Sequence, residues 1–264
     1  MYKMTMIKKL FYSLILICSL AQAQQPIILW DIHDVLLQPE DQLVTLFTFP
    51  HKKDLFSRIS WRLLKSLTSL IAQHLSREVS SEEYIHAAIA SGNPHLAELI
   101  VAVANAQRPI PGMRQLVQEL HELGIEQHIG SNIGKTAFYR LLDGEKHPRI
   151  TPLLQYMNLD ASMVSEYVDG RVVKKPNAFF FERYLEKNNL DPRTTPIIFI
   201  DDRWDNVRVA QSMGFDGILF QNPNQLRTAL RKRGIQIRTP AYKYSHQCTK
   251  NPLRKIANFY RPVA

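Results

Sequence analysis

The sequence predicts an α/β fold in which a parallel sheet alternates with helices and a helical insertion follows the first strand. Short apolar runs, typical of buried strands, alternate with segments of helical periodicity. Several of these runs end in Asp or Ser, at the strand ends where open α/β folds place their ligands. Residues 39–106 show helical patterns and no convincing strand. A chain of 264 residues is long enough for one core with an inserted module.

The first 23 residues are predicted to lie outside this fold. Three lysines form a basic start, residues 10–20 are almost wholly apolar, and Ala21-Gln22-Ala23 supplies the small residues of a cleavage site. This pattern is typical of a secretory signal peptide. The apolar run is shorter than the roughly 20 residues that a membrane-spanning helix needs. We therefore expect cleavage near Ala23, a periplasmic or secreted protein, and no stable membrane anchor.

Cleavage would also change the cysteine count and the charge. It would remove Cys18 and leave Cys248 alone, so no intrachain disulfide is expected. Loss of the three lysines lowers the formal net charge from +9 to +6. Much of the remaining positive charge lies in residues 223–264, which we predict to be a basic C-terminal segment. Such a segment can bind phosphates or anionic lipid, although a solvated face is commoner, and no nucleic-acid partner is predicted.

The first strand is predicted at residues 27–30, between Pro26 and Asp31. The insertion that follows contains a helical pattern between Leu55 and Leu67. Further helix starts are predicted at residues 80–83 and at Asn93-Pro94. We place the insertion at residues 38–108 and the core at residues 24–37 and 109–222.

Beyond the insertion, the periodicity alternates between helix and strand. The predicted helices cover residues 116–123, 136–142, 175–187 and 207–213. The predicted strands cover residues 125–130, 197–200 and 217–220. Gly124 and Gly214 stand where the first and the last of these helices should end. Residues 143–170 are predicted to form a looser region.

Five residues near the ends of these elements carry chemistry. Asp31 could attack phosphorus or carbon, or could bind a metal. Ser131 could donate a hydrogen bond to a phosphoryl oxygen, and Lys175 could neutralise an anion. Asp201 and Asp202 together could hold a hard cation such as Mg²⁺. Each signal also has a structural interpretation when taken alone, since aspartates favour turns, Ser-Asn favours helix caps and lysines are mostly surface residues.

Taken together and in order, these residues resemble the four motifs of the haloacid dehalogenase (HAD) superfamily of hydrolases. The matching segments are residues 27–36, 129–132, 175–177 and 199–207, followed by Ala210 and Gly214. The resemblance covers most of residues 27–220. It implies a Rossmann-like core, and it implies that the insertion between the first two motifs is a helical cap.

The resemblance also implies a nucleophile and a metal site. Asp31 would attack the substrate and form a covalent aspartyl intermediate. Mg²⁺ would be held by Asp31, by the backbone carbonyl of His33 and by Asp202. Asp201 and Asn206 would support the metal or its waters.

The resemblance assigns the phosphoryl oxygens of the substrate to Ser131, Asn132 and Lys175. One position departs from the pattern, because His33 stands where the family's phosphatases have a second aspartate as general acid and base. An imidazole with an unperturbed pKa of about 6.5 can transfer protons, so His33 is our candidate for that role. Asp34, where the family commonly has glycine, is the alternative, and aspartate tolerates the left-handed backbone that suits glycine.

We favour a Mg²⁺-dependent phosphatase that acts on phosphomonoesters. A weakly active or inactive HAD fold that serves as a binding protein is one alternative. A dehalogenase-like, carbon-centred hydrolase is another, because dehalogenases lack the second aspartate and Trp204-Asp205 is similar to their fourth motif. Against it stands the acidic pair Asp201-Asp202, which suits a metal that dehalogenation does not need. The expected partner is a small phosphorylated or other anionic substrate.

Overall fold

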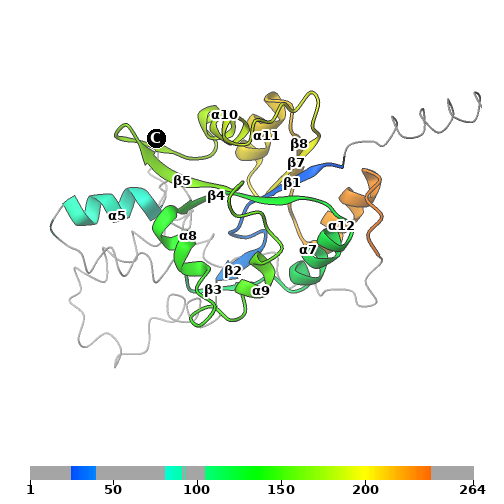
Figure 1. Ribbon diagram of the computed structural model, residues 1–264, viewed down its shortest axis with the longest axis horizontal. Helices are drawn as coiled ribbons and strands as arrows, with labels where there is room; N and C mark the ends of the chain where they lie inside the picture. The colour runs from blue at the N-terminus through cyan, green and yellow to red at the C-terminus, as the bar shows by residue number, and fades with distance from the viewer. Residues whose placement is uncertain (1–24, 40–80, 91, 93–104, 239–264) are drawn as a thin grey trace, which may run out of the picture.

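The computed structural model describes residues 25–39, 81–90, 92 and 105–238 (Figure 1). Three predictions lie wholly or mostly outside these residues: the signal peptide, the helical patterns between residues 40 and 80, and the helix start at Asn93-Pro94. Among the described helices, none combines the length and the apolar character needed to cross a membrane.

A six-stranded sheet forms the centre of the molecule, in the order β6-β5-β4-β1-β7-β8 (Figure 1). Its strands are β1 (Ile27–Trp30), β4 (Gln127–Gly134), β5 (Met163–Val168), β6 (Arg171–Val173), β7 (Ile197–Asp201) and β8 (Asp216–Leu219). All neighbours pair in parallel except β5 and β6, which form an antiparallel edge. The predicted parallel α/β fold is therefore confirmed.

Helices cover both faces of this sheet (Figure 1). They are α7 (Met113–Glu122), α8 (Lys135–Leu141), α9 (Thr151–Leu154), α10 (Ala178–Lys187), α11 (Trp204–Ser212) and α12 (Pro223–Lys232). Side chains alternate along β1, so that Ile28 and Trp30 join the core under α7, α8 and α12, whereas Leu29 joins the core under α10 and α11. Both faces of β1 are thus buried, which explains its unbroken apolar sequence.

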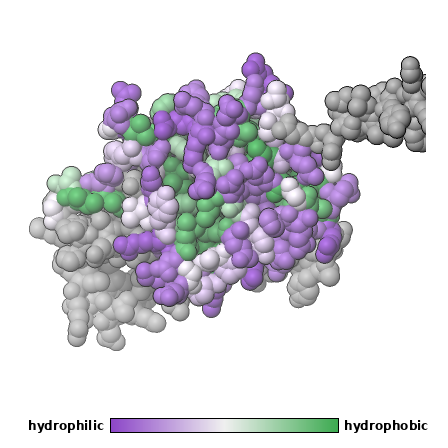
Figure 2. Space-filling view, in the orientation of Figure 1, coloured by the Kyte–Doolittle hydropathy of each residue, from purple (hydrophilic) through white to green (hydrophobic). Residues whose placement is uncertain are grey.

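The insertion leaves and re-enters the core through one two-stranded ribbon. β2 (Leu37–Pro39) pairs antiparallel with β3 (Gln107–Pro109), with Gln38 opposite Arg108. The predicted insertion boundaries therefore lie side by side. The described helix of the insertion, α5 (Ser81–Ala90), begins within the predicted start and packs against β4, β5 and α8. Figure 2 shows hydrophobic surface over α5, where Ile89 is 59% exposed.

Residues 143–170, which the sequence predicted to be a looser region, contain regular structure. Helix α9 and strand β5 lie within them, and β6 follows directly. These strands stand at the edge of the sheet, where only every second residue of the first half of β5 is buried. Buried Met163 and Ser165 therefore alternate with half-buried residues and leave no apolar run in the sequence.

The first part of the predicted basic C-terminal segment packs on the core. Leu226 and Leu230, one turn apart on α12, are buried in the main hydrophobic cluster, and the core continues through Ile237. Arg227 is buried beside them and donates to Glu119 Oε2 at 2.7 Å. The compact core thus extends past residue 222, because the apolar face of α12 is covered and the buried Arg227 is paired with Glu119.

Candidate active site

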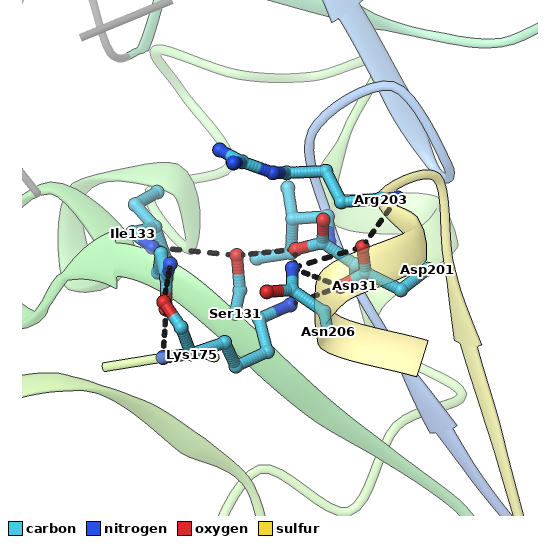
Figure 3. Close-up of polar contacts among 9 residues, drawn as sticks. Asp31, Ser131, Ile133, Lys175, Asp201, Arg203 and Asn206 are labelled. Carbon is cyan, nitrogen blue, oxygen red and sulfur yellow. Dashed lines mark hydrogen bonds and ion pairs between the residues drawn. The ribbon is translucent and has the colours of Figure 1, made fainter. Parts of the chain in front are cut away.

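Three predicted site residues converge at the carboxyl ends of adjacent strands. Asp31 directly follows β1, Ser131 lies in β4 and Asp201 ends β7. Because β1 lies between β4 and β7, the three side chains meet at one edge of the sheet (Figure 3). All three are buried, and Asp31 is only 3% exposed. The sequence predicted that Asp31, Ser131 and Asp202 meet at this edge. Ser131 Oγ lies 2.9 Å from Asp31 Oδ1, and Asp202 belongs to the same acidic cluster as Asp31.

The Asp31 carboxylate is held by donors from three parts of the chain. Its Oδ1 accepts from the backbone N–H of Ile32 at 2.8 Å and from Ser131 Oγ at 2.9 Å. Lys175 Nζ lies 3.1 Å from the same oxygen. These contacts fix the orientation of the buried carboxylate. A nucleophile that must attack along one line requires such a fixed orientation.

Lys175 is 1% exposed and joins the two aspartates. Its Nζ donates to Asp201 Oδ2 at 2.6 Å in addition to its contact with Asp31. A buried ammonium is tolerable only when it is paired in this way. Asn132 clamps the backbone of Lys175, because its Oδ1 accepts from the Lys175 N–H at 2.7 Å and its Nδ2 donates to the Lys175 carbonyl at 2.8 Å. Asn132, predicted to bind substrate, thus positions the lysine, and its contact with substrate stays a prediction.

Asp201 receives donors on both carboxylate oxygens. Arg203 N–H donates to Oδ1 at 2.8 Å, and Asn206 Nδ2 lies 3.0 Å from each oxygen. Helix α11 begins at Trp204, three residues earlier than predicted, which places Asn206 in its first turn beside Asp201. The Oδ1 of Asn206 is buried and has no hydrogen-bond partner among the residues that the structure describes. A buried acceptor in this state points to a water or an ion as its partner.

The acidic residues of the site fit a divalent cation. Asp31, Asp201 and Asp202 each offer a carboxylate oxygen, and these oxygens lie within 4.8 Å of one another. Carboxylate oxygens together with waters are the ligand set that Mg²⁺ prefers. Since Asp201 already accepts from Lys175, Arg203 and Asn206, it suits the supporting role that the sequence predicted. Asn206 Oδ1 could accept from a metal-bound water.

The loop after Asp31 is a tight turn that leads into β2. The N–H groups of Leu36 and Leu37 both donate to the Ile32 carbonyl, and the Asp34 N–H donates to the Leu37 carbonyl at 2.7 Å. Asp34 has a φ of 58°, so the left-handed backbone expected at this position is present. His33 lies half-buried between Asp31 and this turn, within reach of the site by its place in the chain.

Arg203 is the residue to which sequence reasoning gave no role. It stands directly after the acidic pair and just before α11. Figure 3 shows its side chain extending past Asp31 toward β4. The available signal was its position, since the residue that joins a strand-end acidic pair to a helix must lie beside the site.

No protein-family model matches the sequence, and no curated protein matches it. Solved structures do resemble the fold. A predicted HAD-like family hydrolase from Porphyromonas gingivalis has 16% sequence identity and a TM-score of 0.50, over 81% of this chain and 100% of that one. A HAD family enzyme from Bacteroides thetaiotaomicron has 19% identity and a TM-score of 0.50, over 79% of this chain and 99% of that one. The chain therefore has the fold of the HAD superfamily.

Proposed function

We propose that the protein is a Mg²⁺-dependent hydrolase that acts on phosphomonoesters through an aspartyl-phosphate intermediate. The observation that carries this proposal is the arrangement around Asp31. Its carboxylate oxygen is touched by Ser131 and Lys175, and the pair Asp201-Asp202 stands beside it. The HAD fold supports the same class of chemistry.

In the proposed reaction, Asp31 attacks the phosphorus atom, the bond to the leaving oxygen breaks, and water later cleaves the aspartyl phosphate. Ser131 Oγ lies 2.9 Å and Lys175 Nζ 3.1 Å from Asp31 Oδ1, so both groups can also reach the oxygens of a phosphoryl group bound at Asp31. Mg²⁺, held by Asp31, the His33 carbonyl and Asp202, would supply charge that offsets the negative charge of the transferred group. Such fixed charges contribute several kcal/mol to phosphoryl transfer, about a thousandfold or more in rate.

We assign proton transfer to His33, with Asp34 as the alternative. The leaving oxygen needs a proton, and the attacking water must lose one. His33 lies two residues after Asp31 and is half-buried. Variants His33→Ala and His33→Asp, assayed with a good and a poor leaving group, test this role. A proton donor matters more for the poor leaving group, and aspartate should restore part of the rate. Equal losses with both leaving groups would remove His33 from the chemistry.

The acidic network argues against the dehalogenase-like alternative. Asp201 accepts hydrogen bonds from Lys175, from Asn206 and from the Arg203 N–H. Asn206 Oδ1 has no hydrogen-bond partner among the described residues, which fits a metal-bound water as its partner. Dehalogenation needs no metal. Activity of the mature protein on a panel of phosphomonoesters, with Mg²⁺ and with a chelator, tests the proposal against all its alternatives. We expect hydrolysis that depends on Mg²⁺. A protein that binds phosphomonoesters without hydrolysing them would favour the alternative of a HAD fold that serves as a binding protein.

We also propose that the protein is exported and cleaved near Ala23. This rests on the basic start, the short apolar run and Ala21-Gln22-Ala23. Sequencing of the exported protein should find Gln24 at or near its N-terminus. Recovery of the intact chain from the cytoplasm would contradict export.

A further inference from the structure

A cation at the rim of the site has no part in the proposed reaction so far. From β7 into α11 the chain rises toward solvent: Asp201 is buried, Asp202 and Arg203 are half-buried, and Trp204 is 55% exposed. Arg203 therefore lies nearer to solvent than the Asp31 and Asp201 carboxylates. Its own N–H donates to Asp201 Oδ1 at 2.8 Å, so its backbone is fixed by the network that also holds the nucleophile.

The Arg203 side chain and Lys175 lie on different sides of Asp31. Figure 3 shows the guanidinium extending past Asp31 toward β4, while Lys175 approaches from the opposite side. Lys175 is committed to the depth of the site, since its Nζ lies 2.6 Å from Asp201 and 3.1 Å from Asp31. A transferring phosphoryl group must also lie at that depth, against Asp31. The remainder of the substrate then occupies the outer layer, at the level of Arg203.

We propose that Arg203 recognises a second anionic group, a carboxylate or a phosphate, on the leaving-group side of the substrate; this rests on the proposed phosphatase function. The planar guanidinium presents two parallel donors that match either group. The charges of the site favour such a residue. Asp31, Asp201 and Asp202 repel an incoming anion, and Lys175 with a divalent cation only balances those three carboxylates.

The test compares two phosphomonoesters that differ by one carboxylate, O-phosphoserine and O-phosphoethanolamine. The mature protein, beginning at Gln24, is assayed with Mg²⁺ as wild type, Arg203→Ala and Arg203→Lys. Arg203→Ala should lower kcat/KM for O-phosphoserine by about ten- to a hundredfold, mainly through KM, because a hydrogen-bonded charge pair is lost. The rate on O-phosphoethanolamine should change less than about threefold. Arg203→Lys keeps the positive charge but lacks the two parallel donors of the guanidinium. Its kcat/KM for O-phosphoserine should therefore lie between the values of the wild type and of Arg203→Ala.

Arg208→Ala is the matched control, because Arg208 is exposed on the same helix. Equal losses on both compounds would place Arg203 on the phosphoryl group or in the fold, and no loss on either would make it a surface residue; both outcomes overturn the proposal. Calorimetry on Asp31→Asn, with and without Arg203→Ala, separates this from a failure of the hydrolysis proposal. Binding there needs no turnover, and the preference for O-phosphoserine should disappear with Arg203. Absence of that preference in the parent protein also overturns the assignment.

Discussion

The two ends of strand β4 carry polar networks of opposite character. At its amino end, His128 is buried, and both ring nitrogens are engaged: Nδ1 shares a hydrogen bond of 2.8 Å with Tyr184 Oη, and Nε2 lies 2.8 Å from Glu126 Oε1. Gln127 beside it accepts from Trp30 Nε1 and donates to the Val117 carbonyl. At the carboxyl end, the network that includes Ser131 brings three carboxylates together, and two of them, Asp31 and Asp201, pair with Lys175.

This difference separates stability from function within one strand. The amino-end network is closed, because the side-chain groups of Gln127 and His128 find their partners within the chain. The carboxyl-end network concentrates like charges, and within the described part of the chain Asn206 Oδ1 has no hydrogen-bond partner. Concentrated like charges of this kind are typical of functional sites rather than of stabilising networks.

The sharpest test of this contrast is Asp31→Asn. The amide keeps the shape of the side chain and removes the nucleophile, so turnover should fall by roughly a thousandfold or more. Stability should change by less than about 1 kcal/mol, because one of three mutually repelling carboxylates is lost together with one partner of Lys175. Asp205→Asn, the same exchange at an exposed position of α11, is the control for both measurements. Full activity in Asp31→Asn would exclude Asp31 as the nucleophile.

Lys175→Met should expose the cost of the concentrated carboxylates. It leaves Asp31 and Asp201 buried without their cation, so the free energy of unfolding should fall by about 3–5 kcal/mol in denaturant titrations. Added Mg²⁺ should restore part of that loss, because it binds the folded state and supplies positive charge. Lys174→Met, at the neighbouring position whose side chain is about a quarter exposed, should lose much less. If Mg²⁺ left the free energy of unfolding of Lys175→Met unchanged, this result would argue against the metal site.

Sequence reasoning reached the carboxyl end of the sheet more easily than its edge. Strands β1 and β7 are buried on both faces, so their apolar runs are unbroken and their ends are visible. The rule that parallel strands present their carboxyl ends together then predicted that Asp31, Ser131 and Asp202 lie close together, as they do. Strands β5 and β6, the outermost pair on one side of the sheet, escaped prediction because too few of their side chains are buried to leave a pattern.

The contacts inside the site could not be predicted from spacing. Asn132 lies 43 residues from Lys175, yet the oxygen and the nitrogen of its side-chain amide both bond to the backbone of the lysine. The direction of the Arg203 side chain, which extends past Asp31, likewise cannot be read from its position in the sequence. A motif gives the types of residue at a site, whereas the pairing among them depends on how the strands and helices pack.

The closed network at the amino end should govern the response to acid. Burial lowers the pKa of His128 below its ordinary value of 6.5, against the opposing effect of Glu126, while bonds from His128 and Asn158 lower the pKa of Glu126. As the pH falls below 6.5, the unfolded chain takes up a proton that folded His128 resists, so stability declines; the Glu126 contribution is lost below about 4.5.

His128→Gln should flatten the upper part of this decline, between pH 6.5 and the lowered pKa, when unfolding is followed in buffers across that range. His121→Gln, which exchanges an exposed histidine, serves as the control. If the two variants showed the same pH dependence as the wild type, the acid response would have another origin.

The smallest expected effect concerns the contact between the insertion and the core. Glu83 on α5 accepts from Lys174 Nζ at 2.8 Å, and Lys174 directly precedes the site lysine. Both side chains are about a quarter exposed, so the pair should be worth about 0.2–1 kcal/mol. A double-mutant cycle with Glu83→Gln and Lys174→Met isolates this coupling from the other contacts of each residue.

The coupling should appear in the free energy of unfolding and should change kcat less than about threefold, because Asn132 holds Lys175 independently of Glu83. Unfolding titrations and phosphatase assays of the same four proteins give both numbers. A coupling several times larger in catalysis than in stability would contradict this separation. It would mean that the insertion positions Lys175 through Lys174, so that the geometry of the site depends on the insertion as well as on the strand ends.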